Sequence, residues 1–461
     1  MSRLGSILSQ ALAEIRPAKE EMEKTSKAAN LLRERLSEAF SGTALRITFE
    51  GSYAKGTMLR GRSEVDIFIH YPVTVGWEVF SDHTIKISTS VISSLGGSYR
   101  LRFAEHPYVE GFLDGVTVNV VPCYAVDRGR WITAVDRTPY HTEYVRKNLR
   151  PEQVDEVLLL KSLLMASDLY GAEIRIAGFS GYMCELLIIR YGSLENLLSE
   201  ASRWRVPVTL GPESERLREK DPYAPIILAD PVDPERNTAA AISLDKLSHF
   251  ILLSKAFLRR PSVNYFRRHP PVDFTVSCRG RSLLAVSFDS FAERSPDVLW
   301  GEIRRSGEGI ARALNHYGFN VLRWDACLNE LATVILYELS DVRLGELMLH
   351  GGPPASNERA MDFVEKALSS QEVVAGPWIK GGRLYCLKRR RYTSAAELLR
   401  EKLSGGEVSV ARGLADALKK ARLLENLDEI AGELTSLKME SFLKEFLEAC
   451  PNYLKAYRLS S

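Results

Sequence analysis

The stretch Gly51–Tyr71, GSYAKGTMLRGRSEVDIFIHY, decides the fold that we expect for this chain of 461 residues. A Gly-Ser pair ends one alternating segment, and the stretch closes with a second one, Glu64–Tyr71, so two strands joined by a loop are predicted. A Gly-Ser turn lets backbone N–H groups and a hydroxyl approach a phosphate closely. The loop after Ser52 also carries three basic residues, Lys55, Arg60 and Arg62. The stretch therefore predicts a phosphate-binding turn beside a strand.

Two acidic residues of the second strand point to a metal site. The apolar residues at 65, 67 and 69 would share its buried face, and Glu64 and Asp66 would share the other. Neighbouring carboxylates repel each other unless a cation lies between them, and Mg²⁺ prefers carboxylate oxygens. An isolated acid pair at this spacing is more often the solvated face of an edge strand, but the turn and the basic loop favour a metal site here.

A site of this kind usually takes a third carboxylate from a neighbouring strand. In the alternating segment 116–121, Val118 and Val120 face one side and Asn119 faces the other. The third ligand position therefore holds a neutral amide. Asp114 cannot easily replace it, because five residues along a strand span about 16 Å.

The rest of the N-terminal pattern predicts a mixed head domain. Apolar residues at helical spacing predict helices in the first forty residues, with an interruption at Pro17. The sequence further predicts strands around Leu45–Phe49, at Tyr99–Phe103 and at Val116–Pro122, with a hairpin turn at Asp114-Gly115.

From about Pro151 the pattern becomes mainly helical, and beyond residue 260 it is mixed. The expected elements are helices at Val154–Ser167, Gly181–Tyr191, Ala240–Arg259 and Ser306–Tyr317 and within 195–220, strands at Ser282–Phe288 and Leu384–Lys388, either state at Cys327–Leu339, an insertion at 340–380, and helices over 406–456. We therefore predict an α+β multidomain protein. Its domains would be a head at 1–150, a helical domain at 151–260, and an α+β body with a helical tail at 261–461.

Composition excludes several classes of protein. The 61 Lys and Arg against 59 Asp and Glu exclude a uniformly basic nucleic-acid wrapper, although they permit a local basic groove. No apolar stretch is long enough to span a membrane, and the amphipathic N-terminus lacks a signal-peptide core. The six cysteines lie far apart in the sequence. Reduced thiols in a cytoplasmic protein without a zinc site are expected.

Seven segments between Gly51 and Asn237 carry a family resemblance, namely GSYAKGT, EVDIFI, RFAEHPYVEG, VVPCY, AVDRTPYHTEYV, YGAEIRIAGFSGYMCELL and DPVDPERN. The turn and the acid pair resemble the polymerase-beta-type nucleotidyltransferase superfamily. All seven together resemble the archaeal (class I) CCA-adding enzymes, which rebuild the CCA end of tRNA from CTP and ATP without a nucleic-acid template. The resemblance implies a nucleotidyltransferase head, a helical domain that completes the nucleotide pocket, and Mg²⁺ as cofactor.

Carried over by position, the resemblance also implies roles for individual residues. The triphosphate contacts would be Ser52 and Lys55. The metal-binding, catalytic positions would be Glu64, Asp66 and Asn119. The residues around the sugar and phosphates of the incoming nucleotide would be Thr138, His141, Lys161 and Tyr170. Arg236, with Asn237 beside it, matches the region that reads the base.

Some of these residues have ordinary structural alternatives. His141 would merely close a turn, Lys161 would extend from an apolar helix face to solvent, and Tyr170 would pack at a helix end. For His106 a structural role is favoured over a catalytic one.

Two positions depart from the family pattern. Lys55 stands where the family more often has arginine, so the charge is kept but the bidentate fork is lost. Asn119 stands where the family has an aspartate that bridges both metals. Losing that charge would remove about 3–5 kcal/mol of transition-state stabilisation, a slowing of about 10²–10⁴. Two explanations stay open: an impaired enzyme, or a paralogue of the same fold retained to bind the tRNA 3′ end.

Local basic clusters predict RNA contacts. The clusters and their neighbouring aromatic residues are Arg259-Arg260, Arg267-Arg268-His269 and Lys388–Arg391, with Tyr265, Phe266 and Tyr392 expected to stack on unpaired bases. The resemblance implies that the C-terminal half grips the acceptor stem and T-loop of tRNA by shape. We place Lys388–Arg391 on that surface. The sequence leaves open whether a tail helix forms a homodimer.

The leading hypothesis is a Mg²⁺-dependent tRNA nucleotidyltransferase that adds C, C and A to the tRNA 3′ end. A poly(A) or oligoadenylate-type transferase would share the head, but the segments 135–145 and 230–237 disfavour it.

Overall fold

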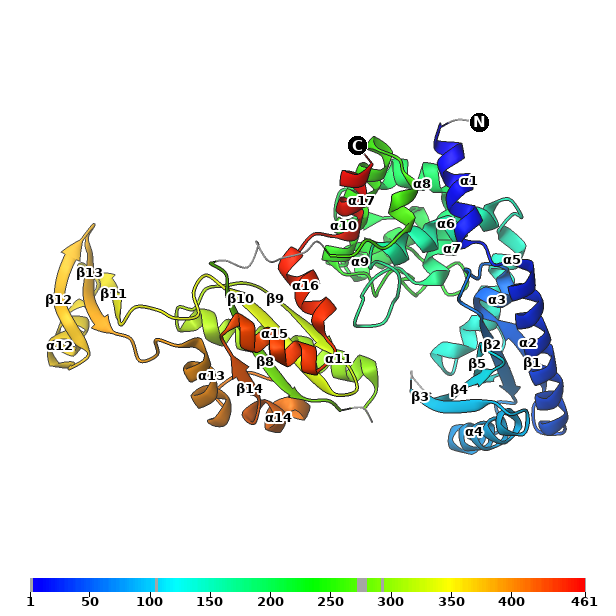
Figure 1. Cartoon of the computed structure of the whole chain (residues 1–461), viewed down its shortest axis with the longest axis horizontal. Coiled ribbons are helices and arrows are strands. Elements are labelled where there is room, and N and C mark those ends of the chain that lie inside the picture. The colour runs from blue at the N-terminus through cyan, green and yellow to red at the C-terminus, as the bar shows by residue number, and fades with distance from the viewer. Residues whose placement is uncertain (1–2, 104–106, 272–279, 292–293, 461) are drawn as a thin grey trace. The chain divides into compact units, whose positions relative to one another are not determined.

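A computed structural model of the chain describes residues 3–103, 107–271, 280–291 and 294–460. The chain divides into two compact units (Figure 1). The first contains residues 1–270 together with 450–461, and the second contains residues 271–449.

The first unit opens with two helices and a five-stranded sheet. Its elements are α1 (Arg3–Ile15), α2 (Lys19–Ala39), β1 (Arg46–Glu50), α3 (Gly51–Lys55), β2 (Glu64–Tyr71), α4 (Trp77–Ser94), β3 (Ser98–Phe103), β4 (Pro107–Leu113) and β5 (Val116–Tyr124). The strand order is β1-β2-β5-β4-β3, in which β2 and β5 run parallel and the other neighbours are antiparallel. The core of this part forms where α2 and α4 pack on one face of the sheet.

The sequence pattern explains this sheet. The alternating residues Val65, Ile67 and Ile69 of β2 are buried in the core, as predicted. The hairpin between β4 and β5 turns at Asp114 and Gly115, which both have positive φ angles of 50° and 73°. The predicted Asp-Gly turn is therefore confirmed.

A helical region follows in the same unit. Its elements are η1 (Ala134–Arg137), α5 (Thr138–Asn148), α6 (Gln153–Ala166), α7 (Gly181–Tyr191), α8 (Leu194–Ala201), β6 (Val208–Thr209), η2 (Pro212–Ser214), α9 (Glu215–Lys220), β7 (Ile226–Ile227), α10 (Leu244–Arg259), η3 (Val263–Phe266) and α17 (Asn452–Leu459). Its core also includes Ala11 of α1 and Tyr453 of α17. Both ends of the described chain therefore pack into this helical core.

The second unit is a four-stranded sheet covered by helices on both faces, with a smaller sheet beside it. Its elements are β8 (Ser282–Asp289), α11 (Pro296–His316), β9 (Val321–Leu328), β10 (Ala332–Leu339), β11 (Leu347–Pro354), α12 (Ala360–Ser369), β12 (Val373–Lys380), β13 (Arg383–Arg389), α13 (Ala395–Ser404), η4 (Arg412–Leu414), α14 (Ala415–Lys419), β14 (Arg422–Leu424), α15 (Leu427–Ser436) and α16 (Glu440–Glu448). The sheet orders are β14-β8-β10-β9 and β11-β13-β12. Alternate residues of β8 and β10 enter two separate cores, so both faces of the larger sheet are buried.

Three expectations for the second unit are refined. The ambiguous segment Cys327–Leu339 is strand, divided between β9 and β10. The expected insertion at 340–380 supplies two strands and the helix of the small sheet. The expected all-helical segment 406–456 is interrupted by β14, which pairs with β8. In the first unit, α10 begins at Leu244 rather than at Ala240. The α+β multidomain fold class is confirmed, whereas the three-domain division stays a prediction.

Two further observations concern thiols and membranes. The five described cysteines form no disulfide, and Cys278 lies outside the described residues. Among the helices that the structure describes, none is long and apolar enough to cross a membrane.

Candidate active site

The predicted acid pair lies beside Asn119 on two parallel strands. In the register of β2 and β5, Asp66 stands opposite Asn119. The Asn119 Nδ2 group donates hydrogen bonds to Glu64 Oε1 at 2.7 Å and to Asp66 Oδ1 at 3.0 Å. The amide therefore takes the place between the two carboxylates where a cation is expected.

Crowding around Asp66 makes its negative charge costly. Burial raises the pKa of Asp66 to about 6, the hydrogen bond from Asn119 opposes this shift, and the charge of Glu64 adds to it. The Asn119 Oδ1 atom is itself buried and accepts no hydrogen bond. The two neighbouring carboxylates thus share one neutral amide as a hydrogen-bond donor.

The residues present fit a divalent cation at the acid pair, because two neighbouring carboxylates are hard oxygen donors and the Asn119 amide lies against both. Within the described ranges, no three His, Cys, Asp or Glu side chains are grouped to hold a metal ion. The donor set is one carboxylate short of the two-metal site that the family resemblance implies.

The Gly-Ser turn lies directly against the acid pair. Gly51 has a φ of +67°, and a Cβ atom there would lie 1.9 Å from Asp66 Oδ2. Only glycine fits this backbone conformation and this approach. Ser52 follows in the short helix α3, which ends at Lys55. The turn thus brings the predicted phosphate contacts within the same small region as the predicted metal ligands.

Lys55 and Lys161 share a buried carboxylate. Lys55 Nζ lies 2.6 Å from Glu185 Oε2, and Lys161 Nζ lies 3.2 Å from Glu185 Oε1. The Thr57 hydroxyl donates a hydrogen bond to Glu185 Oε1 at 2.7 Å. Burial alone would raise the pKa of Glu185, but the charges of the two lysines hold it below its ordinary value. These four residues form what we call the lysine–glutamate cluster.

Lys161 does not extend to solvent. Its residue is 2% exposed, and its ammonium donates hydrogen bonds to Thr57 O, Thr57 Oγ1 and Glu185 Oε1. All three N–H groups of the ammonium are therefore used inside the protein. The alternative of a snorkelling lysine is excluded.

A second network centres on Asp230, which is fully buried. Its carboxylate contacts His141 Nε2 at 2.8 Å and accepts hydrogen bonds from Tyr182 Oη at 3.0 Å and Arg236 Nη1 at 2.9 Å. Burial opposes the charge, but the hydrogen bond with His141 and the other partners lower the pKa of Asp230 to about 2. The ring of His141 also stacks on Tyr182, with 4.0 Å between centroids. We call this set the Asp230 hub.

Three predicted residues in or beside the hub have definite positions in the structure. His141 lies in the first turns of α5 rather than closing a loop. The Arg236 side chain is 36% exposed, so its remaining donors can reach a ligand. Asn237 is instead committed to backbone, because its Oδ1 accepts from Leu228 N and Ala239 N and its Nδ2 donates to Ile226 O.

Thr138 and Tyr170 complete the predicted set. Thr138 begins α5, one turn before His141. Tyr170 pairs with Phe179 in an isolated bridge after α6 has ended at Ala166, so it is not a helix cap. Burial raises the pKa of the Tyr170 hydroxyl, which lies 2.9 Å from where a Cβ of Gly181 would be. His106 lies outside the described residues.

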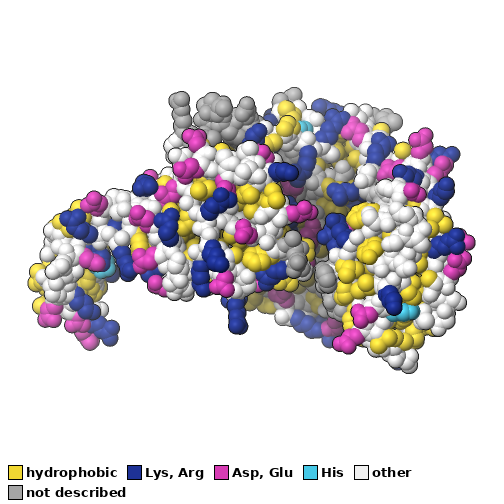
Figure 2. Space-filling model, turned by 60° about the horizontal axis from the view of Figure 1, so that its bottom comes forward, with side chains coloured by type: hydrophobic (Ala, Val, Ile, Leu, Met, Phe, Trp, Pro, Cys, Tyr) yellow, Lys and Arg dark blue, Asp and Glu magenta, His cyan; other side chains and the backbone are white. Residues whose placement is uncertain are grey.

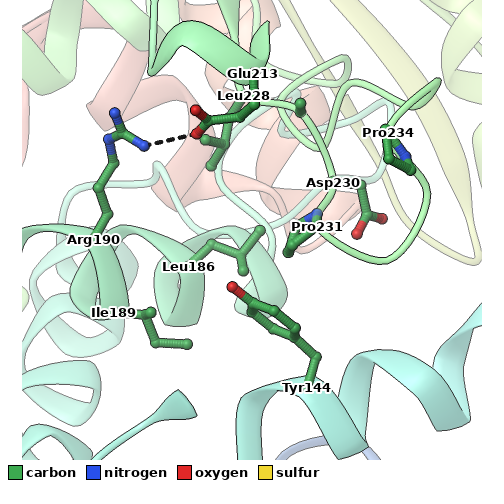
Figure 3. A pocket seen from close by; sticks show the side chains of 10 residues that line it. Tyr144, Leu186, Ile189, Arg190, Glu213, Leu228, Asp230, Pro231 and Pro234 are labelled. Atoms are coloured by element: carbon green, nitrogen blue, oxygen red, sulfur yellow. Dashed lines mark hydrogen bonds and ion pairs between the residues drawn. The ribbon is translucent and has the colours of Figure 1, made fainter.

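A cavity of about 230 Å³ lies behind the hub, between α5, α7 and the loop around Asp230 (Figure 3). Its lining residues are Tyr144, Leu186, Ile189, Arg190, Glu213, Leu228, Ala229, Asp230, Pro231 and Pro234. The Arg190–Glu213 ion pair, with 2.9 Å between Nη1 and Oε1, stands at its rim. The walls are mainly apolar.

Sequence reasoning missed four residues of the site: Thr57, Tyr182, Glu185 and Asp230. Each lies inside a segment that carries the family resemblance, GSYAKGT, GYMCELL or DPVDPERN. The available signal for Glu185 was a lone acid within an apolar helical run. Such an acid needs a buried positive partner.

The predicted basic clusters are largely paired with acids. The ion pairs are Arg267–Glu14, Arg268–Asp168, Lys388–Glu372, Arg389–Glu346 and Arg391–Glu401. Figure 2 shows the same intermingling of basic and acidic side chains on the face in view. The predicted stacking of Tyr265, Phe266 and Tyr392 on bases is wrong, because all three side chains are buried in cores.

Comparisons with known proteins place the chain in a family. Three domain families match it in order: nucleotidyltransferase domain at residues 29–141, tRNA nucleotidyltransferase, second domain at 155–267, and CCA-adding enzyme, C-terminal domain at 279–426. The mixed head sheet and these matches make the chain a nucleotidyltransferase.

Relatives narrow this class further. The chain is 38% identical over 408 residues to a CCA-adding enzyme of Pyrobaculum neutrophilum, covering 88% of this chain and 95% of that protein. CCA-adding enzymes of Sulfurisphaera tokodaii and Methanothermobacter thermautotrophicus are 36% and 34% identical, over 87% and 88% of this chain and 92% and 88% of theirs. The chain belongs to the CCA-adding enzyme family.

Proposed function

We propose that the protein is a tRNA nucleotidyltransferase that adds C, C and A to the 3′ end of tRNA from CTP and ATP. One observation carries the proposal beyond family membership. The acid pair lies against the turn at Gly51, and the lysine–glutamate cluster begins at Lys55 on the same turn. A cation site next to a triphosphate site is what nucleotidyl transfer requires.

The incoming nucleotide is positioned by this chain's own groups. Ser52 and Lys55 hold the triphosphate at the turn. Thr138, His141 and Tyr170 surround the sugar, and Lys161 supports the phosphates through the cluster. Arg236, oriented by Asp230, presents its remaining donors to the base edge. Base choice without a template strand then rests on this pocket.

The acid pair would bind the cation that the reaction needs. Glu64 and Asp66, with Asn119, would bind Mg²⁺, which when bound neutralises charge at the attacking hydroxyl and the leaving pyrophosphate. Asn119 adds no formal charge, so we expect slow turnover, about 10²–10⁴ below that of an aspartate-containing site. The C-terminal half would hold the acceptor stem and T-loop of tRNA.

The test uses tRNA that lacks CCA, incubated with the protein, Mg²⁺, CTP and labelled ATP. The matched variant is Asn119→Asp. Full CCA addition that is slow in the parent and about 10²–10⁴ faster in N119D supports the proposal. Repeated A addition without CTP would identify a poly(A)-type transferase instead.

A second candidate function is favoured by the hydrogen bonds of Asn119. Because its amide bridges both carboxylates, the acid pair is already stabilised without a metal. The protein would then bind the tRNA 3′ end without turnover. If neither the parent nor N119D transfers nucleotides while both bind tRNA, this function is the correct one.

A further inference from the structure

The lysine–glutamate cluster contains more than a phosphate contact requires. Glu185 and Thr57 are each 0% exposed, and the side chains of Lys55 and Lys161 are 8% and 3% exposed. Two ammonium groups and one carboxylate leave a single net positive charge in a region from which water is largely excluded. A buried carboxylate in direct contact with a phosphate-binding lysine has an energetic consequence for every anion that binds there.

The two lysines differ in what they can offer to an anion. Lys161 already donates all three of its N–H groups, two of them to Thr57. Lys55 donates one described hydrogen bond, to Glu185 at 2.6 Å, and its ammonium lies 5.9 Å from the centre of the Tyr182 ring. Two N–H groups of Lys55 are therefore left for a phosphate. Lys55 is the cation that a triphosphate can reach.

The charge of Lys55 also acts on both halves of the site. It opposes the rise that burial causes in the pKa of Asp66 on one side, and on the other it adds to the lowering that burial causes in the pKa of His141. A phosphate that binds Lys55 is thus next to the acid pair, and it must share the ammonium with Glu185.

From this geometry we infer that Glu185 is a positioning residue that competes with pyrophosphate for Lys55 and so promotes its release after each addition. The inference rests on the proposed function. Glu185 already orders the side chain of Lys55 before a nucleotide binds, so less side-chain entropy is lost on binding. After transfer, the same carboxylate offers Lys55 an alternative partner to the leaving pyrophosphate. Three successive additions make this release necessary three times per tRNA.

The test is the affinity of magnesium pyrophosphate for the protein, measured by isothermal titration calorimetry without any turnover. Glu185→Gln keeps the shape of the side chain and an oxygen that accepts from Thr57 and Lys161, but it removes the carboxylate. We expect E185Q to bind pyrophosphate about tenfold or more tightly. Removing the carboxylate leaves the two buried ammonium groups without their negative partner, so the net positive charge of the cluster rises by one. General damage to the site would weaken binding instead. Unchanged or weaker binding by folded E185Q would overturn the inference.

E185Q can fail to fold if it leaves a buried lysine unpaired, because an unpaired buried charge is destabilising. A second pair of variants then provides the test. Lys161→Met alone keeps the Lys55–Glu185 pair, and K161M/E185Q removes only the carboxylate from that background. Tighter pyrophosphate binding by the double variant than by K161M supports the inference, and equal or weaker binding contradicts it. If neither the parent protein nor E185Q binds pyrophosphate, the proposed function fails; if both bind it equally, only this inference fails.

Discussion

Asp66 is a carboxyl group whose surroundings favour the protonated form. Its pKa of about 6 lies above the ordinary value of 3.8, so folding favours the neutral acid. This contribution to stability is fully present below pH 3.8 and is lost as the pH rises through 6. We therefore expect the part of the stability that comes from Asp66 in the metal-free protein to be lost between pH 4 and pH 7, while His70 and His141, whose pKa values are lowered by burial, contribute in the opposite direction. Thermal unfolding at several pH values measures this.

Asp66→Asn provides the reference, because it keeps the shape and the hydrogen-bonding capacity but does not titrate. Relative to that of the parent, its melting temperature is expected to rise as the pH increases from 4 to 7, because the loss due to Asp66 is absent. Identical pH profiles for the parent and D66N would show that the environment of Asp66 does not shift its titration.

Arg236, a member of the Asp230 hub, is the residue that we propose to contact the base of the incoming nucleotide. Replacing it with alanine leaves Asp230 bonded to His141 and Tyr182, so the hub should persist. A lost hydrogen bond to a charged donor corresponds to about 1.5–3 kcal/mol, or about tenfold to a hundredfold in selectivity. We expect R236A to lose discrimination of CTP and ATP against GTP and UTP, while Mg²⁺ affinity is unchanged. Single-nucleotide incorporation measures the first and Mn²⁺ titration the second; equal loss for all four nucleotides contradicts the role.

The turn and the acid pair, which the residue pattern indicated without the family resemblance, lie close together along the chain. Gly51, Glu64 and Asp66 fall within one short stretch, where alternation fixes which side chains share a face. Glu185 meets Lys55 across 130 residues, and Asp230 meets His141 across 89. No local pattern encodes such contacts, because they depend on how α7 and the loop after β7 pack against the head sheet.

Helix α7 has the predicted bounds, Gly181–Tyr191, although residues 183–188 are all buried. Cys327–Leu339 could not be decided because both faces of β10 are buried, so apolar residues occupy both faces and do not alternate with polar ones. Strand β14 has only three residues, too few to show alternation, and its pairing with β8 is set by tertiary packing.

The end of β13 carries the basic run that we assign to RNA binding. Lys388 and Arg389 are paired with Glu372 and Glu346, so each phosphate contact would have to replace an acidic partner. Reversing both charges, K388E/R389E, should weaken tRNA binding and reduce the slope of log K against log salt by about 0.7–0.9 per lost contact. Filter binding at several salt concentrations measures the slope.

A matched control reverses a charge elsewhere in the same unit. Lys419, in α14, is exposed and paired with Asp416, so K419E makes a similar change away from β13. An unchanged slope in K388E/R389E, or an equal change in K419E, would remove this strand from the RNA surface.

The first unit is built from two separate segments of the chain, because residues 450–461 return to it after the second unit. Tyr453 of α17 is 1% exposed in the helical core, and its hydroxyl lies 2.9 Å from His249 Nδ1 of α10. Removing residues 450–461 would expose this part of the core. We expect a loss of at least about 3 kcal/mol in the free energy of unfolding, comparable to truncating a large buried aromatic side chain. Urea unfolding measures it, and the matched control is Leu459→Ala, since Leu459 is 59% exposed. Equal stability of the truncated protein would show that α17 is not part of this core.

The return of α17 also has a consequence for biosynthesis. The ribosome must translate all of residues 271–449 before Tyr453 exists, so the surface of α10 that it covers stays bare during that time. The helical core of a nascent chain therefore cannot be completed before residues 271–449 have been made, and the apolar surface of α10 stays uncovered until then. We therefore expect the newly made protein either to bind a chaperone at this apolar surface or to become active slowly after synthesis.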